Sequence, residues 1–246
     1  MPEGGPATGG RLEVLALEGI PEIAVGDDLP TILVAALRGT PGALPARDDD
    51  VLVVTQKVVS KAEGRLVALD PDDLGARRAL VEAESVRIVR RRGDLIISET
   101  RHGFVCANSG VDLSNVEAGT AALLPVEPDR SAKHVRDALR VRFGVEVAVI
   151  VSDTFGRAWR LGLTDVAIGI SGIAGVVDLR DTPDAVGRIL HVTEVAVADE
   201  IAGAAELVMG KAAGIPAAIV RGLDGSWSRE GSYRELVRPP AEDLFR

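Results

Sequence analysis

Cysteine and histidine are scarce in this chain, which contains one cysteine, Cys106, and three histidines among 246 residues. A single cysteine excludes an internal disulfide bond, and a reducing cytoplasmic setting is the natural expectation. A zinc site built from cysteine and histidine is not expected either, because too few of these ligands are present. Candidate metal ligands must therefore be sought among carboxylates and hydroxyls.

Aromatic residues and long apolar runs are also lacking. Aromatic residues make up 3% of the chain and hydrophobic residues 46%, so the core should consist of Val, Leu, Ile and Ala. No apolar run approaches the roughly 18 residues that a membrane-spanning helix needs. We therefore expect no membrane as a partner.

Common nucleotide-binding signatures are missing as well. The segment 209–212 (MGKA) lacks both the leading glycine and the hydroxyl of a Walker loop, and no dinucleotide fingerprint follows a strand. The formal net charge of −9 argues against non-specific binding of nucleic acid. A local basic pocket remains compatible with that charge, so a nucleotide would have to bind by an unusual route.

The composition divides the chain into three parts, with no internal repeat. Residues 1–10 are rich in Gly and Pro and predict a flexible tail without an apolar signal core. Residues 11–222 mix strand and helix patterns and predict an α+β fold, and the length allows one large domain or two small ones. Residues 223–246 are polar and predict a tail or a linker to a further domain.

The apolar patterns predict the following elements. Strands are expected at 12–17, 51–54, 94–99, 103–107, 147–151, 166–172 and 215–220, and helices at 28–39, 72–92, 131–143 and 201–208. Three arginines, Arg90 to Arg92, would end the second helix, where they suit the negative end of its dipole. A site for an anionic substrate is the alternative for these arginines.

A buried strand at 147–151 is expected to end in a polar tip that contains Asp153 and Thr154. In α/β sheets, ligands gather just beyond the carboxyl ends of such strands. Carboxylate and hydroxyl oxygens suit Mg²⁺ or Mn²⁺. The alternative is that both side chains only cap the following turn.

Two other strand ends carry polar side chains of the same kind. Gln56, Lys57 and Lys61 follow the strand at 51–54 and could hold phosphate, although a pair of ordinary surface lysines is the alternative. Asp112 and Asn115 lie in the polar loop after the strand at 103–107. Two carboxylates from separate loops, together with a hydroxyl, could hold two divalent ions against a polyphosphate.

Several of these segments resemble motifs of the coenzyme F420 γ-glutamyl ligase family, in the family's order and across residues 12–222. The segments are 53–65, 107–115, 152–160, 164–169 and 193–200. The resemblance is strongest with the amino-terminal half of the two-domain actinobacterial form, in which a flavin-binding nitroreductase-like domain follows.

The resemblance implies a two-lobed, mixed α/β fold that forms a homodimer and binds metal and nucleotide in a groove. It implies a GTP-dependent ligase that adds L-glutamate to the lactyl-phospho deazaflavin precursor of coenzyme F420 and then extends the tail through γ-linkages. An acyl phosphate would be the intermediate. Such a reaction needs no covalent enzyme nucleophile, which agrees with the scarcity of cysteine and histidine.

The resemblance also assigns residues. Asp112 and Asp153 would bind one divalent metal, Mg²⁺ or Mn²⁺, and Thr154 would help to bind a second, with K⁺ as a further candidate cation. Lys61 would join the two aspartates in catalysis. The residues implied in GTP binding are Ile20, Pro21, Glu22, Ile23, Gln56, Lys57, Lys61, Asn115, Met209, Gly210, Lys211, Ala212, Ala213, Gly214, Ile215 and Pro216.

The remaining candidates are charged residues whose roles are less specific. Arg157 and Arg160 would anchor the polyanionic substrate, and structural pairing with nearby carboxylates is the alternative. Asp165 and Glu194 could hold the metal ligands in position through hydrogen bonds, without binding the metal themselves. Two rival functions remain: a metal-dependent nucleotide phosphohydrolase, and a non-catalytic module that binds a nucleotide or deazaflavin.

Overall fold

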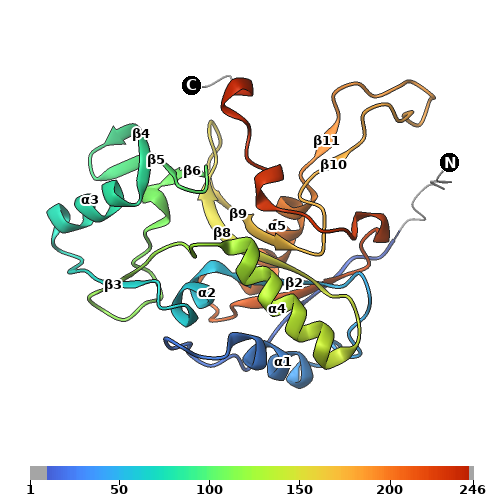
Figure 1. Cartoon of the computed structure of the whole chain (residues 1–246), viewed down its shortest axis with the longest axis horizontal. Coiled ribbons are helices and arrows are strands. Elements are labelled where there is room, and N and C mark those ends of the chain that lie inside the picture. Colours follow the sequence, from blue (N-terminus) through green and yellow to red (C-terminus); the bar gives the residue numbers. More distant parts are fainter. Residues whose placement is uncertain (1–9, 244–246) are drawn as a thin grey trace.

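The computed structural model describes residues 10–243, so the predicted tail at 1–10 lies outside the described residues except for Gly10 (Figure 1). A five-stranded sheet forms the centre, in the order β1-β12-β2-β8-β9. Its strands are β1 (Glu13–Ala16), β12 (Ala217–Arg221), β2 (Val51–Thr55), β8 (Ala148–Gly156) and β9 (Leu163–Ser171). Strands β2 and β8 run parallel, and the other neighbours are antiparallel.

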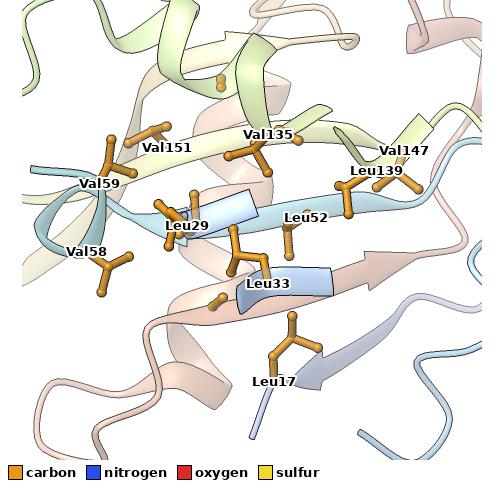
Figure 2. Packing of buried hydrophobic residues seen from close by; sticks show 14 of the residues in the cluster. Leu17, Leu29, Leu33, Leu52, Val58, Val59, Val135, Leu139, Val147 and Val151 are labelled. Carbon is orange, nitrogen blue, oxygen red and sulfur yellow. The ribbon is translucent and has the colours of Figure 1, made fainter. Parts of the chain in front are cut away.

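Helices cover both faces of this sheet. On one face lie α1 (Leu29–Gly39), α2 (Gln56–Ala62) and α4 (Pro128–Phe143), and on the other lies α5 (Val197–Met209). Within β2, Leu52 and Val54 enter the first core cluster, whereas Val51 and Val53 enter the second. Burial on both faces explains why the central strands are continuous apolar runs. Figure 2 shows the first cluster, where Leu33 and Val135 pack onto the sheet.

The ends of the helices agree with the local sequence signals. Asp28 caps α1 by accepting a hydrogen bond from the Thr31 N–H at 3.2 Å, and a proline occupies the first turn. Helix α4 ends at Gly144, which adopts the left-handed conformation with φ of 72°. The predictions of helices at 28–39 and 131–143 are therefore confirmed within a few residues.

Smaller sheets extend the molecule beside the main one. Strands β4 (Ser85–Arg92), β5 (Leu95–Thr100) and β6 (Val105–Ala107) form one sheet, and β3 (Leu66–Ala68) pairs with β7 (Thr120–Ala122). Helix α3 (Leu74–Ala83) and the 3-10 helix η1 (Asn108–Gly110) lie beside them. Strands β10 (Val177–Asp178) and β11 (Glu194–Val195) form an arm that projects from the body in Figure 1.

The predicted single helix at 72–92 is wrong, because helix α3 stops at Ala83 and strand β4 begins at Ser85. Strand β4 contains the β-branched residues Val86, Ile88 and Val89 and pairs with β5 across a turn at Gly93. Arg90, Arg91 and Arg92 thus lie on a strand, and the helix-dipole explanation for them does not apply.

The segment after β12 packs onto the body. Its 3-10 helices are η2 (Gly225–Trp227), η3 (Tyr233–Glu235) and η4 (Pro240–Glu242). Tyr233 is buried, and Asp129 of α4 accepts hydrogen bonds from the Ser232 hydroxyl at 2.6 Å and the Tyr233 N–H at 3.2 Å. A role of 223–246 as linker to a further domain stays a prediction. No helix within residues 10–243 is long and apolar enough to cross a membrane.

Candidate active site

One edge of the main sheet brings distant loops together. Strand β2 ends at Thr55, directly beside Ser152 of the parallel strand β8. The Thr55 N–H donates to the Pro216 carbonyl at 2.8 Å, and the Leu17 N–H donates to the Ala217 carbonyl at 2.9 Å. The loop after β1, the helix after β2 and the loop before β12 therefore meet at this edge.

These segments line a groove of about 1250 Å³ that contains most of the predicted site. The predicted residues in its lining are Ile20, Pro21, Glu22, Ile23, Gln56, Lys57, Lys61, Asp112, Asn115, Asp153, Thr154, Gly210, Lys211, Ala212, Gly214, Ile215 and Pro216. Met209 and Ala213 do not belong to the lining, and Met209 is fully buried in the second core cluster.

Asp153 and Thr154 lie within a strand, which corrects the prediction that β8 ends before them. Strand β8 continues to Gly156, and its pairing with β9 shifts register between Val151 and Ser152. Such a bulge re-aims the side chains beyond it. Because both residues are in a strand, the alternative that they cap a turn is excluded.

Three carboxylates gather around this strand. Burial raises the pKa of the Asp153 carboxyl to about 7, and the charges of Asp112 and Asp165 add to the rise, while the Thr154 N–H opposes it. Asp165 is itself buried and accepts hydrogen bonds from the Thr154 hydroxyl and from the Ser152 hydroxyl, the latter at 3.0 Å. Asp165 therefore orients Thr154, and its role in supporting a metal ligand stays a prediction.

Each lysine of the groove already pairs with a carboxylate. Lys57 lies 2.8 Å from Asp112, Lys211 lies 3.3 Å from Asp165, and Lys61 pairs with Glu22. The Lys61 side chain is only 8% exposed and that of Lys57 16%, so the alternative of two surface lysines is wrong. Both belong to α2, one helical turn apart, which places them on the same side of that helix.

Main-chain contacts hold Asp112 in the groove. The Asp112 N–H and carbonyl bond to Ala122, at 3.0 and 2.8 Å. The adjacent Leu123 carbonyl accepts hydrogen bonds from the Ser60 hydroxyl at 2.6 Å and the Gln56 amide at 3.0 Å. Gln56 is thus committed to positioning this segment, although it also lines the groove.

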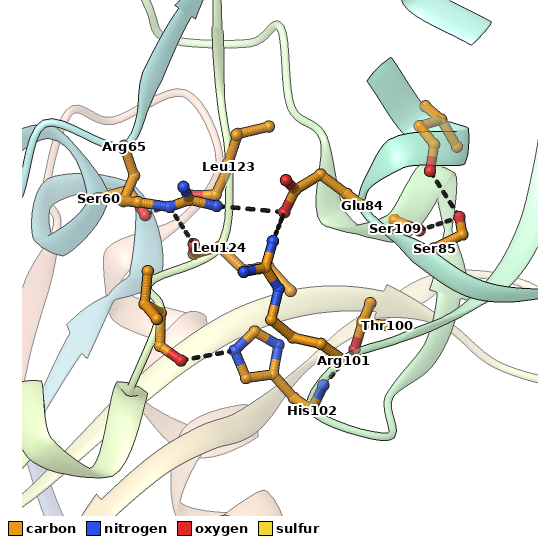
Figure 3. A network of polar contacts seen from close by, with 12 residues as sticks. Ser60, Arg65, Glu84, Ser85, Thr100, Arg101, His102, Ser109, Leu123 and Leu124 are labelled. Carbon is orange, nitrogen blue, oxygen red and sulfur yellow. Dashed lines mark hydrogen bonds and ion pairs between the residues drawn. The ribbon is translucent and has the colours of Figure 1, made fainter. Parts of the chain in front are cut away.

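A second polar network fastens the smaller sheets to the body (Figure 3). Glu84, at the end of α3, accepts from Arg65 at 3.2 Å and from Arg101 at 2.6 Å, and Arg65 also donates to the Leu124 carbonyl at 3.0 Å. His102 stacks near Phe104, and its Nε2 lies 3.1 Å from the Val126 carbonyl. This histidine has a structural position and does not belong to the groove lining.

The donor set at the groove fits a hard divalent cation in combination with phosphate oxygens. Asp112 and Asp153 offer carboxylates, Thr154 offers a hydroxyl, and the raised pKa of Asp153 marks a site where positive charge would be stabilising. Within residues 10–243, no three or more His, Cys, Asp or Glu side chains are grouped closely enough to hold a metal alone. A cation here would need ligands from the substrate, as Mg²⁺ usually does.

The other predicted charged residues lie outside the groove lining. Arg157 and Arg160 are exposed on the turn between β8 and β9, and Arg157 donates to the Leu161 carbonyl at 2.6 Å rather than to a carboxylate. Glu194 lies on the projecting arm, 3.4 Å from Arg180. The structure therefore does not support Glu194 as a partner of the metal ligands.

Sequence reasoning missed several residues of the lining. Glu117 and Glu206 add two carboxylates, and Ser114 receives a hydrogen bond from Lys57 at 2.9 Å. Ser114 lies two residues after Asp112 in the same polar loop, so the polar composition of this loop could have indicated Ser114 as a site residue. Glu206 lies on α5, far along the chain, and no local pattern separates it from a solvent-facing helix residue.

Comparison with known proteins identifies the family. The model of the F420-0:gamma-glutamyl ligase family matches residues 19–222, which is most of the chain. The chain belongs to this family. The match covers every segment that lines the groove, from the loop after β1 to the loop before β12.

Archaeal relatives of the family align over nearly their whole length. The coenzyme F420:L-glutamate ligase of Methanothermobacter thermautotrophicus is 43% identical over 251 residues, covering 96% of this chain and 99% of that protein. The coenzyme F420:L-glutamate ligase of Methanopyrus kandleri is 42% identical, covering 96% and 100%. That of Archaeoglobus fulgidus is 40% identical, covering 96% and 97%.

Proposed function

We propose that this protein is a GTP-dependent ligase that adds L-glutamate to the lactyl-phospho deazaflavin precursor of coenzyme F420 and then extends the tail through γ-linkages. The family match and the names of the archaeal relatives support the reaction class. The observation that carries the proposal is one groove in which Asp112, Asp153 and three lysines meet.

The charge of the groove supports a requirement for divalent cations. Its lining contains three more carboxylates than lysines and, within the described residues, no arginine or histidine. A bare triphosphate would be repelled by this excess of negative charge. Bound Mg²⁺ or Mn²⁺ would reverse the balance and neutralise the charge on the phosphate oxygens.

The residues have separate tasks in this proposal. Asp112 and Asp153 would hold one divalent cation, and Thr154, oriented by Asp165, would contribute to a second; K⁺ is a further candidate. Asp112, once engaged in this way, would release Lys57 to the phosphate oxygens, whereas Lys211 would stay beside Asp165. Lys61 would exchange Glu22 for a phosphate oxygen in the same manner.

The reaction then follows in two displacements. A carboxylate oxygen of the acceptor attacks the γ-phosphorus of GTP, the bond to the bridging oxygen breaks, and GDP leaves. The glutamate amine next attacks the acyl carbon, phosphate leaves, and the amine loses a proton. Lys61 stabilises negative charge on the transferring group, and the groove supplies proximity and limits access of water. The proposal also includes that the protein forms a homodimer and that each chain has two lobes.

Stoichiometry tests this function. With GTP, L-glutamate, Mn²⁺ and the deazaflavin acceptor, phosphate release should equal the number of glutamyl residues found in the product by mass spectrometry. Omitting glutamate should suppress accumulation of free phosphate. Phosphate release that ignores glutamate would favour the nucleotide phosphohydrolase, and binding without turnover would favour the non-catalytic module.

A further inference from the structure

Within the part of the chain that the structure describes, the groove offers no aromatic side chain against which the ring of the acceptor could stack. Its lining, as defined by residues 10–243, contains no phenylalanine, tyrosine or tryptophan. The acceptor of the proposed reaction carries a deazaflavin ring, and such rings are usually held against aromatic or apolar side chains. An aromatic partner for the ring must therefore come from outside the groove, while the reacting carboxylate lies inside it.

An exposed apolar surface stands at the rim of the groove, on the turn that joins β8 to β9. Trp159 is 82% exposed, Leu161 is 95% exposed and Leu163, which also lines the groove, is 68% exposed. Among the aromatic residues of the described chain, Trp159 alone is exposed. Three large apolar side chains are thus exposed within five residues, and exposed apolar clusters mark sites that bind ligands or other proteins.

The turn is held in a defined shape by its own contacts. The Arg157 guanidinium donates to the Leu161 carbonyl at 2.6 Å, which closes the turn across four residues. Gly162 adopts φ of 84°, and Trp159 adopts φ of 57°, a conformation that costs energy for a residue with a side chain. Strained backbone of this kind is typical of sites that bind ligands.

We propose that residues 157–163 form the platform for the planar ring of the acceptor, with Trp159 and Leu161 as its contact surface. This inference rests on the proposed function. The turn continues the strand that carries Asp153, and the three residue-to-residue steps from Asp153 to Gly156, where the turn begins, span roughly 10 Å. The linker between ring and reacting carboxylate has a length of the same order.

The charge of the turn suits the same occupant. Arg157 and Arg160 flank Trp159, so cationic groups lie beside the apolar surface, whereas the groove itself is acidic. The acceptor has a matching arrangement, with an apolar ring followed by an anionic phosphodiester. A ligand that lies along β8 would place its ring on Trp159, its phosphodiester near the arginines and its carboxylate near Asp153.

Calorimetry on the full chain tests the platform with two probes, the lactyl-phospho deazaflavin and a deazaflavin that lacks phosphate. Trp159→Ala should weaken binding of both probes by about tenfold, and Trp159→Phe should restore affinity to within about threefold, because a flat ring remains. Leu161→Ala should also weaken binding. Leu207→Ala, which removes an equally exposed leucine from α5, should leave it unchanged. GTP affinity should stay constant in all four variants.

Three results would overturn the platform. One is unchanged deazaflavin affinity in Trp159→Ala while the wild type still ligates glutamate, which would leave the proposed function intact. Another is equal loss of GTP and deazaflavin affinity. The third is a change of sedimentation mass in Trp159→Ala, which would assign the turn to a contact between copies of the chain. A wild type that neither binds deazaflavin nor incorporates glutamate would instead defeat the proposed function itself.

Discussion

At the scale of single residues, the groove is a set of matched opposite charges. Lys57, Lys61 and Lys211 each pair with a carboxylate, and the paired lysines differ widely in exposure, from 8% for Lys61 to 56% for Lys211. An unpaired charge destabilises the protein more when it is buried, so among these lysines Lys61 depends most on having a partner. Glu22, which is 83% exposed, is the partner that can swing away at least cost.

Lys61 should therefore contribute to nucleotide affinity more than any exposed lysine does. We expect Lys61→Ala to weaken GTP binding by at least about tenfold and to affect deazaflavin binding less, because a buried charge–phosphate contact is lost. Isothermal titration calorimetry with each ligand measures the difference. Lys133→Ala, in an exposed pair with Asp137 on α4, is the matched control and should change neither affinity. A larger loss for deazaflavin than for GTP would contradict the role of Lys61.

Residue types alone indicated much of this site, but not the contacts. Asp112, Asp153, Lys57 and Lys61 follow apolar strands, and that position marks them as candidates. The partners of the lysines depend on the fold, because Glu22 lies 39 residues from Lys61 and Asp165 lies 46 residues from Lys211. No local pattern encodes such pairs.

At the scale of elements, the predictions succeeded where the apolar period was clear. Helices α1 and α4 agree with their predicted positions, because capping residues and apolar runs mark them. The apolar parts of the central strands agree as well, although β8 continues to Gly156, beyond its predicted end at 151. The prediction of one helix at 72–92 was wrong because Val86, Ile88 and Val89 also suit a helical period. Their β-branched side chains favour a strand, which is what they form. Helix α2 was missed because it follows β2 without a turn residue between them.

The packing of β9 against α4 provides a stability test at this scale. A Cβ atom on Gly169 would lie 2.5 Å from the Pro128 carbonyl oxygen, so α4 would have to move away from the sheet. We expect Gly169→Ala to lower the free energy of unfolding by about 1–3 kcal/mol, measured by urea titration. Gly156→Ala in the neighbouring strand has nothing within 4 Å and should change it by less than about 1 kcal/mol. Equal effects of both substitutions would contradict this packing argument.

At the scale of the whole molecule, the order of the strands creates the site. Placing β2 between β12 and β8 brings helix α2 and the loops at 18–25 and 210–216 to one edge of the sheet. The sequence predicted the strands but not their order, because pairing between segments more than 90 residues apart leaves no local signal. The groove, and with it the meeting of Asp112 and Asp153, follows from that order.

The central claim is that acidic side chains of this groove support glutamate ligation through divalent cations. The most direct test compares the rate of glutamate incorporation into the deazaflavin acceptor by the wild type and Asp153→Asn, with GTP and Mn²⁺ present. We expect a loss of at least about a hundredfold with unchanged circular dichroism, because an amide is a poor ligand for these cations. Glu117→Gln, which removes one negative charge from the same groove, should keep most of the activity. Near-normal incorporation by Asp153→Asn would contradict the account.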